Sequence, residues 1–231
     1  MNSTKTMFMK KELQVLMIDD HPMIIDSYKT TLLGEHQKEY DLSIDIANDC
    51  DGAHELLKES ALGVNYDIMF VDIKLPPSKD GTITSGEDLA KIAQELLPNV
   101  RVVVLTMHRE DYRIHNIIKN VNPIGFLVKS DLTSMELLQA FNQIAAGKSY
   151  FSATVNDHFR KTISNNFSLD EKNLKILYYL SRGIKTKNLS KYVSLSLSAI
   201  EKRKIHMKEL FSLEKAGDER LIEEARNRGF V

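Results

Sequence analysis

The first part of the chain alternates short apolar runs with longer amphipathic ones. Three of the short runs are almost continuously apolar, as is typical of parallel strands covered on both faces. The predicted strands are residues 13–18, 42–46, 66–71, 100–105 and 124–128. The predicted helices are residues 22–34, 50–61, 86–97, 109–119 and 133–147. This alternation predicts right-handed crossovers and an α/β doubly wound fold on a five-stranded parallel sheet.

The last third of the chain has a different pattern, which is helical throughout. A capping box of Ser168 and Glu171 opens its first predicted helix. Further predicted helices span residues 186–193, 197–211 and 218–228. The segment before Ser168 has the character of a linker with one short amphipathic helix, whose apolar positions are Val155, Phe159 and Ile163. The predicted organisation is a first domain at residues 12–147, a linker at residues 148–167 and a helical second domain at residues 168–231.

Charge separates along the chain in the same way. The 231 residues carry a formal net charge of −1, but residues 168–231 carry +5 and residues 1–167 carry −6. An acidic front part joined to a basic tail suggests two tasks, the second on a polyanion. Chance segregation of surface charge remains the alternative.

Several classes of protein are disfavoured by composition. No apolar run reaches the roughly 18 residues that a membrane-spanning helix needs, and residues 1–11 lack the apolar core of a secretory signal. The single cysteine, Cys50, has no partner for an internal disulfide, and the 7 histidines show no zinc-binding spacing. We expect a cytoplasmic, disulfide-free protein.

Polar residues stand at the ends of four predicted strands. Asp19 and Asp20 follow the first, Asp72 the third, Thr106 ends the fourth and Lys129 follows the fifth. Ligands of doubly wound sheets bind at the carboxyl ends of the strands. Clustered carboxylates favour Mg²⁺, and a lysine and a threonine can bind phosphoryl oxygens while one carboxylate acts as a nucleophile. Each residue alone has a structural explanation as a helix cap or strand end, but the five together, at four strand ends, are specific.

These residues resemble the receiver domain of bacterial two-component response regulators, over about residues 12–147. The matching segments are Asp19-Asp20-His21, Val71-Asp72-Ile73-Lys74-Leu75-Pro76, Leu105-Thr106 and Gly125-Phe126-Leu127-Val128-Lys129. The resemblance implies a flavodoxin-like fold in which Asp72 accepts a phosphoryl group from a histidine kinase. It also implies Mg²⁺ bound by Asp20, Asp72 and the backbone carbonyl of Lys74, with Asp19 acting through water.

The same resemblance assigns phosphoryl-binding and switching roles to three further residues. Thr106 and Lys129 would bind the phosphoryl oxygens, and Phe126 matches the aromatic residue that turns inward when Thr106 moves. An ordinary strand core residue is the alternative for Phe126. His21 is read as a structural neighbour of the site.

Two features depart from the receiver pattern. Residues 77–85 are longer than the usual connection, and the family's glycine is Gly81 or Gly86, of which Gly86 fits the helix start better. The inserted loop is either a flap beside the phosphorylation site or a tolerated insertion. Lys74 is bulkier and more charged than is usual two residues after the phosphoacceptor of this family. Because that position influences how water reaches the acyl phosphate in the family, we expect Lys74 to alter the lifetime of the phosphoryl group.

The basic tail contains a predicted helix-turn-helix between Thr186 and Phe211. Ser196 is the predicted N-cap of its second helix, which carries the basic side chains Lys202, Arg203, Lys204 and Lys208. A charged helix face is usually solvated, but here it falls on the element that enters the major groove of DNA.

Residues 168–231 resemble the four-helix LuxR-type DNA-binding domain, and with the receiver they resemble a NarL/FixJ-type regulator. The supporting residues are Leu177, Gly183, Leu189, Leu195-Ser196, Ala199-Ile200 and the segment 224–231. By this resemblance Glu201, Lys202 and Ile205 read bases. Lys204 and Lys208 lie elsewhere around the helix, and we expect them to contact phosphates, which position the protein without specifying sequence. Alternatively, Glu201 pairs with a neighbouring lysine. The helix at 218–228 would be the contact of a homodimer formed on phosphorylation.

The sequence therefore predicts a phosphorylation-controlled regulator that binds double-stranded DNA and is not an enzyme. One alternative is a phosphotransferase or phosphohydrolase with an aspartyl-phosphate intermediate. Those of the haloacid dehalogenase type carry a second aspartate where this chain has Lys74. The other alternative is a receiver whose tail docks a protein partner.

Overall fold

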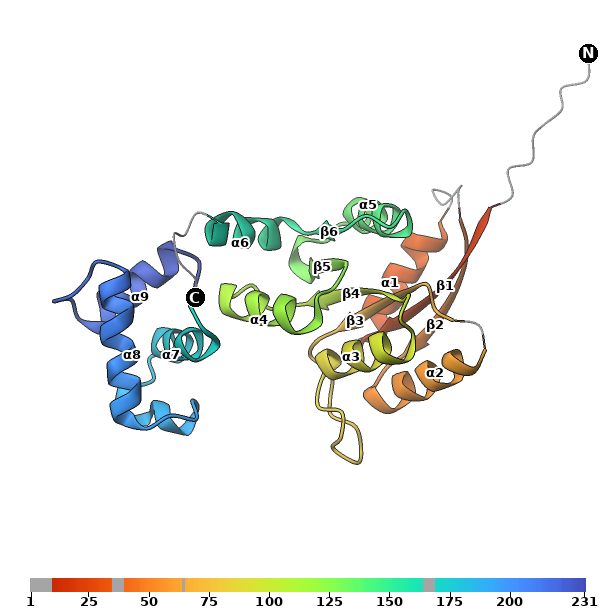
Figure 1. Ribbon diagram of the computed structural model, residues 1–231. Coiled ribbons are helices and arrows are strands. Elements are labelled where there is room, and N and C mark those ends of the chain that lie inside the picture. Colours follow the sequence, from red (N-terminus) through yellow and green to blue (C-terminus); the bar gives the residue numbers. More distant parts are fainter. Residues whose placement is uncertain (1–9, 35–39, 64, 164–168) are drawn as a thin grey trace, which may run out of the picture. The chain divides into compact units, whose positions relative to one another are not determined.

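Two compact units make up the chain. The computed structural model describes residues 10–34, 40–63, 65–163 and 169–231 (Figure 1). The first unit comprises residues 1–107 and 120–152, and the second comprises residues 108–119 and 153–231. The predicted linker is thus divided at residue 152, and its last residues, 164–167, lie outside the described residues together with the predicted cap Ser168.

A six-stranded parallel sheet in the order β2-β1-β3-β4-β5-β6 forms the centre of the first unit. Its strands are β1 (Lys11–Ile18), β2 (Tyr40–Ala47), β3 (Ile68–Asp72), β4 (Arg101–Thr106), β5 (Gly125–Val128) and β6 (Tyr150–Phe151). The predicted doubly wound parallel sheet is confirmed. The prediction missed β6, which falls in the predicted linker and pairs Tyr150 with Gly125. Two residues are too few to show any periodicity.

Helices cover both faces of this sheet, as the near-continuous apolar strands require. They are α1 (Pro22–Leu33), α2 (Cys50–Leu62), α3 (Gly86–Leu96) and α5 (Ser134–Ala145), with a short 3-10 turn, η1 (Lys129–Asp131), before α5. α1 contacts α5 on one face, and α2 contacts α3 on the other (Figure 1). The predicted capping box of Thr133 and Glu136 opens α5. Phe70, Leu127 and Phe141 are among the fully buried side chains between the sheet and its helices.

The second unit is helical among its described residues, as predicted. Its elements are α6 (Ala153–Ile163), α7 (Glu171–Ser181), the 3-10 helix η2 (Thr186–Lys191), α8 (Leu197–Leu210) and α9 (Asp218–Asn227). The helix α4 (Asp111–Val121) also belongs to this unit as far as Lys119. The helix predicted at 186–193 is therefore a shorter 3-10 segment. The N-cap of α7 is Asp170, whose carboxylate accepts the Asn173 N–H at 2.8 Å, so the predicted Ser168 capping box was wrong. In the part of the chain that the structure describes, no helix combines the length and apolar character needed to span a bilayer.

Candidate functional site

The carboxyl edge of the sheet brings polar residues together. In the register of the sheet, β1 ends level with β3 and β4 ends level with β5. The residues at or just beyond these ends are Asp19, Asp72, Thr106 and Lys129. The sequence-based expectation that these four gather at one edge is confirmed.

A buried ionic cluster lies at this edge. The Lys129 ammonium is 2.6 Å from Asp19 Oδ2 and 2.6 Å from Asp72 Oδ2. All three side chains are less than 5% exposed, at 4%, 2% and 3%. The other oxygen of Asp72, Oδ1, accepts the backbone N–H of Lys74 at 3.1 Å. Both oxygens of the Asp72 carboxylate are therefore held, one by a cation and one by a backbone N–H, so its orientation is fixed.

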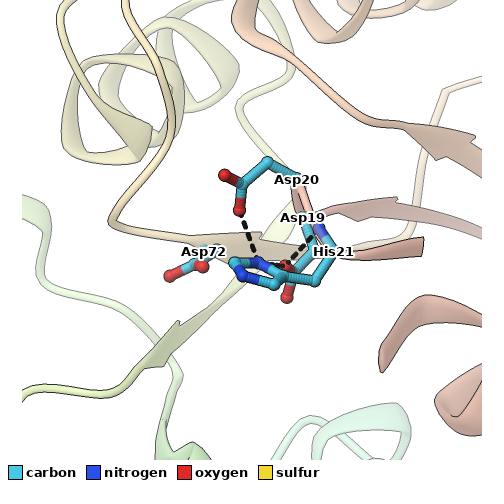
Figure 2. Close-up of side chains that lie close together, drawn as sticks. All are labelled: Asp19, Asp20, His21 and Asp72. Atoms are coloured by element: carbon cyan, nitrogen blue, oxygen red, sulfur yellow. Dashed lines mark hydrogen bonds and ion pairs between the residues drawn. The ribbon is translucent and has the colours of Figure 1, made fainter. Parts of the chain in front are cut away.

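Asp20 and His21 complete the cluster on its more exposed side (Figure 2). His21 Nδ1 lies 2.7 Å from Asp20 Oδ1 and 3.2 Å from Asp19 Oδ1. Asp20 Oδ1 is buried, yet within the described part of the chain no group donates it a hydrogen bond of good geometry. A buried carboxylate oxygen without a donor costs free energy, and an added cation would relieve that cost.

The electrostatics of the cluster fit a divalent cation. Counted with a neutral His21, three carboxylates and one ammonium leave two uncompensated negative charges. Burial, followed by the charges of Asp19 and Asp72, raises the pKa of Tyr28 to about 12. One ligand atom from each of Asp19, Asp20, His21 and Asp72 lies within 4.8 Å of the others. This donor set, rich in carboxylate oxygens, fits Mg²⁺.

The glycine at the start of α3 lets the strand β3 pack closely against this helix. A Cβ atom added at Gly86 would lie only 1.9 Å from the backbone oxygen of Asp72. The Gly86 N–H also donates to the Ile73 carbonyl at 3.1 Å. By contrast, Gly81 has φ +70° in the inserted loop and open space around its α-carbon among the described residues. The choice of Gly86 over Gly81 as the matching glycine is therefore supported by packing.

The inserted loop at 77–85 has its own hydrogen bonds. The Ser78 hydroxyl donates to Asp80 at 2.6 Å and accepts the Ile83 N–H at 3.0 Å. The hydrogen bond from Ser78, followed by those from the Thr82 N–H and hydroxyl, lowers the pKa of Asp80 to about 2. The Lys79 N–H donates to Asp51 of α2 at 3.2 Å, and the Ile83 side chain is buried. The segment is therefore an ordered loop that is held by its own hydrogen bonds and by one hydrogen bond to α2.

The two residues expected to act as a switch are both buried. Thr106 and Phe126 are 0% exposed, on the neighbouring strands β4 and β5. Burial of Phe126 agrees with an inward-turned switch residue and equally with an ordinary core residue. Lys74, in contrast, is exposed.

In the second unit, the exposed side of α8 carries acidic, basic and apolar side chains. Ser196 is its N-cap and accepts the Ala199 N–H at 3.3 Å, as predicted. Glu201, Lys202 and Ile205 are exposed. The three expected base-reading side chains therefore lie on the solvent side of the helix.

The other basic residues of α8 lie differently from the sequence-based expectation. Lys204 is only 5% exposed, and its ammonium contacts Asp218 at 2.7 Å, Thr186 at 2.8 Å and Glu201 at 3.2 Å. Lys208 also pairs with Asp218, at 3.1 Å. Although burial opposes ionisation, the two lysines lower the pKa of Asp218. The prediction that Lys204 contacts phosphates is thus corrected, because the side chain lies inside the unit and joins α8 to α9.

Arg203 has a similar structural contact. Its guanidinium donates to Asp170 at 2.7 Å and to Asn173 at 2.9 Å, both at the start of α7. The sequence reasoning did not find Asp170, Asn173 or Asp218 as partners. No local pattern links them to α8, because turns and whole helices separate them along the chain.

Replacing Lys204 should therefore weaken the second unit. We expect Lys204→Met to lower the free energy of unfolding by about 1–3 kcal/mol, below the full cost of breaking a buried pair, because Asp218 keeps Lys208 and is partly exposed. Urea denaturation of the full chain measures this loss. Lys202→Met, on the exposed side of the same helix, is the matched control and should change stability by less than about 0.5 kcal/mol. Equal stability of the two variants would contradict the structural role of Lys204.

Comparison with known proteins identifies the class to which this fold and site belong. Residues 15–142 match the response regulator receiver domain family. This match covers more than half of the chain, and the chain belongs to that family.

Similarity to other regulatory proteins extends beyond the receiver. The oxygen regulatory protein NreC of Staphylococcus haemolyticus is 21% identical over 84% of this chain and 89% of its own length. The transcriptional regulatory protein MctR of Rhizobium johnstonii is 24% identical over 86% of this chain and 87% of its own length.

Solved structures share the fold. A structure of two RcsB dimers bound to two parallel DNAs has a TM-score of 0.61 at 18% identity, covering 94% of this chain and 99% of the RcsB chain. A LuxR-family two-component response regulator from Aurantimonas sp. SI85-9A1 has a TM-score of 0.53 at 21% identity, over 65% of this chain and 97% of its own. At these identities the similarity establishes the fold alone.

Proposed function

We propose that this response regulator is of the NarL/FixJ type, accepts a phosphoryl group on Asp72 from a sensor histidine kinase and binds double-stranded DNA to regulate transcription. The observation that carries the proposal is the buried Asp19–Lys129–Asp72 cluster at the carboxyl edge of a receiver sheet. The DNA-bound RcsB structures and the transcriptional relative MctR support the second part.

The chain's own residues suit phosphoryl transfer from a phosphohistidine. An Asp72 carboxylate oxygen attacks phosphorus, the P–N bond to the donor histidine breaks, and an acyl phosphate forms. Lys129 keeps its positive charge beside the incoming phosphoryl oxygens, and the Thr106 hydroxyl donates a hydrogen bond to one of them. Because this step modifies the chain itself, and because Lys74 stands where a hydrolase of the haloacid dehalogenase type has a second aspartate, we propose an acceptor rather than a turnover enzyme.

Mg²⁺ is the proposed cofactor of this step. Asp20, Asp72 and the Lys74 carbonyl would hold it directly, with Asp19 acting through water. When bound, the ion neutralises phosphoryl oxygens and so lowers the barrier to transfer. The undonated Asp20 oxygen and the two excess negative charges of the cluster support this assignment.

Recognition of DNA is proposed for the exposed side of α8. Glu201 suits a cytosine amino group as an acceptor, Lys202 suits guanine, and Ile205 suits a thymine methyl group. Lys208 is half-buried and Arg203 is held by α7, so phosphate contact by either requires its ion pair to open. The last helix, α9, is proposed as the contact of a homodimer formed on phosphorylation.

Selection of binding sites from random duplexes tests the DNA-reading proposal. Glu201→Ala should relax the preference at one or two positions of the selected motif, with an effect of roughly 1–3 kcal/mol per position. Its ion pair with Lys204 is half-exposed and contributes little to stability. Glu209→Ala, near the opposite end of α8, is the control and should keep the motif. An unchanged motif in Glu201→Ala would rule out base reading by this residue.

Docking of a protein partner by the second unit is the second candidate. The observation in its favour is that Arg203, Lys204 and Lys208 are already engaged in intramolecular ion pairs. DNA binding predicts an affinity that falls steeply with salt, because phosphate contacts release counterions. Titration of the phosphorylated chain with sheared DNA across a salt series separates the candidates, since a partner-docking unit would show no such binding.

A further inference from the structure

We infer that His21 is a metal ligand in the receiver site, and that this imidazole makes the site bind first-row transition-metal ions such as Co²⁺ in preference to Mg²⁺. The inference rests on the metal site of the proposed function and concerns the identity of its ion. The sequence alone indicated only a structural neighbour for His21.

Geometry carries the first step. Two ligands on opposite sides of an ion with bonds of about 2.1 Å lie about 4.2 Å apart. The ligand atoms of Asp19, Asp20, His21 and Asp72 already lie within 4.8 Å of one another. Figure 2 shows the imidazole of His21 lying among the three carboxylates rather than pointing away from them. Small side-chain movements would bring the ligand atoms of Asp20, His21 and Asp72 onto one ion, with Asp19 acting through water as in the proposed Mg²⁺ site.

The second argument is that a buried oxygen of Asp20 accepts no hydrogen bond among the described residues. Lys129 already compensates one oxygen of Asp19 and one of Asp72. Asp20 Oδ1 has His21 Nδ1 as its ionic neighbour at 2.7 Å, and among the described residues it accepts no hydrogen bond. The ring nitrogen already has a hydrogen-bond contact with Asp19 Oδ1 at 3.2 Å, so a cation beside both atoms would replace that contact and would satisfy the buried Asp20 oxygen. The His21 side chain is 62% exposed, so it has room to adjust.

Ligand chemistry then determines the preferred ion. Mg²⁺ takes oxygen ligands and dehydrates reluctantly, so an imidazole ligand adds little to its binding affinity. Imidazole suits the later transition metals, whose affinities rise along the series from Mn²⁺ to Cu²⁺. One nitrogen among carboxylate oxygens should therefore raise the affinity for Co²⁺ and leave the affinity for Mg²⁺ nearly unchanged.

The ordinary explanation of His21 is that it begins α1. It occupies the N-cap position before Pro22, but its side chain makes no capping hydrogen bond, and its backbone N–H donates to Asp19 Oδ1 at 3.1 Å. Asparagine is a favourable N-cap residue and offers an oxygen where histidine offers a nitrogen. His21→Asn therefore preserves the helix start and removes only the nitrogen ligand.

Calorimetric titration of the full chain with CoCl₂ and with MgCl₂ tests the inference, and it suits a chain without tryptophan. Loss of even an outer partner of a metal ligand typically costs 10–100-fold in affinity. We expect His21→Asn to lower the ratio of Co²⁺ to Mg²⁺ affinity at least about tenfold, with Mg²⁺ affinity changed less than about threefold. His54→Asn, which removes an imidazole from α2, is the matched control and should keep the wild-type ratio.

Proton NMR of the Co²⁺-loaded chain supplies a readout that a merely structural role would not change. A ring ligated through Nδ1 keeps its proton on Nε2, and the paramagnetic ion shifts that resonance far outside the normal range. This resonance should be present in wild type and in His54→Asn and absent from His21→Asn. Its absence from wild type, or an equal affinity ratio in wild type and His21→Asn, would overturn the inference.

Failure of the underlying metal site has a different signature. If wild type binds no Mg²⁺, or if Asp20→Asn binds it as tightly as wild type does, the proposed Mg²⁺ site is wrong. The Co²⁺ resonance of His21 still decides the inference in that case. The two failures are therefore distinguishable in one set of titrations.

Discussion

The Asp72→Asn chain is expected to take up no phosphoryl group from acetyl phosphate in the presence of Mg²⁺, whereas wild type takes up one. The amide of asparagine is a poor nucleophile and carries no charge to pair with Lys129, which lies 2.6 Å from Asp72 Oδ2. Intact-protein mass spectrometry measures the uptake, and lability to hydroxylamine identifies an acyl phosphate.

Two further variants make this test specific. Asp26→Asn removes an exposed carboxylate of α1 and should leave the uptake unchanged. Asp20→Asn should retain the acceptor but slow the uptake, because it weakens the proposed Mg²⁺ site. Phosphorylation of Asp72→Asn at the wild-type level would exclude Asp72 as the phosphoacceptor.

The second large effect is expected for Gly86→Ala. The added methyl group would lie 1.9 Å from the Asp72 carbonyl oxygen, so backbone rather than a flexible side chain would have to shift. We expect a loss of at least about 3 kcal/mol in the stability of the first unit, at the upper end for overpacking, together with slower phosphorylation.

Urea denaturation followed by circular dichroism measures this loss. Gly34→Ala in the same unit is the control, because Gly34 has φ −63° and an added Cβ would make only ordinary contacts there. A Gly86→Ala chain as stable as Gly34→Ala would show that the packing of α3 on β3 is looser than the structure indicates.

Much of the first unit was predictable because its signals are local. Buried parallel strands produce continuous apolar runs, and the residue after each run must lie at the carboxyl edge of the sheet. Asp72 and Lys129 could therefore be placed together although 57 residues separate them. The strand β6 could not be predicted, because a two-residue strand depends only on its pairing with β5.

The interactions of the basic helix were much less predictable. The positive charge of the tail indicated a polyanion-binding surface, but a count of charges contains no information about pairing. Lys204 and Lys208 meet Asp218 only because α9 folds back against α8. Arg203 meets Asp170 only because α7 begins beside it. Tertiary structure therefore decides which lysines and arginines remain available to a partner.

The position of His21 was also hidden by its sequence context. A histidine after a strand is usually a neighbour of the site rather than a ligand. Its position among three carboxylates depends on the turn between β1 and α1, together with the approach of Asp72 from β3. Distances across that turn are needed before the residue can be assigned any chemistry.

The most direct test of the central claim is the affinity of the full chain for a selected DNA duplex before and after treatment with acetyl phosphate and Mg²⁺, measured by fluorescence anisotropy. If phosphorylation of Asp72 controls DNA binding, treatment should strengthen wild-type binding by about tenfold or more, within the usual range for coupling between two sites. Asp72→Asn should show the same affinity with and without treatment. Equal wild-type affinities before and after confirmed phosphorylation, or the same gain in Asp72→Asn, would contradict the claim.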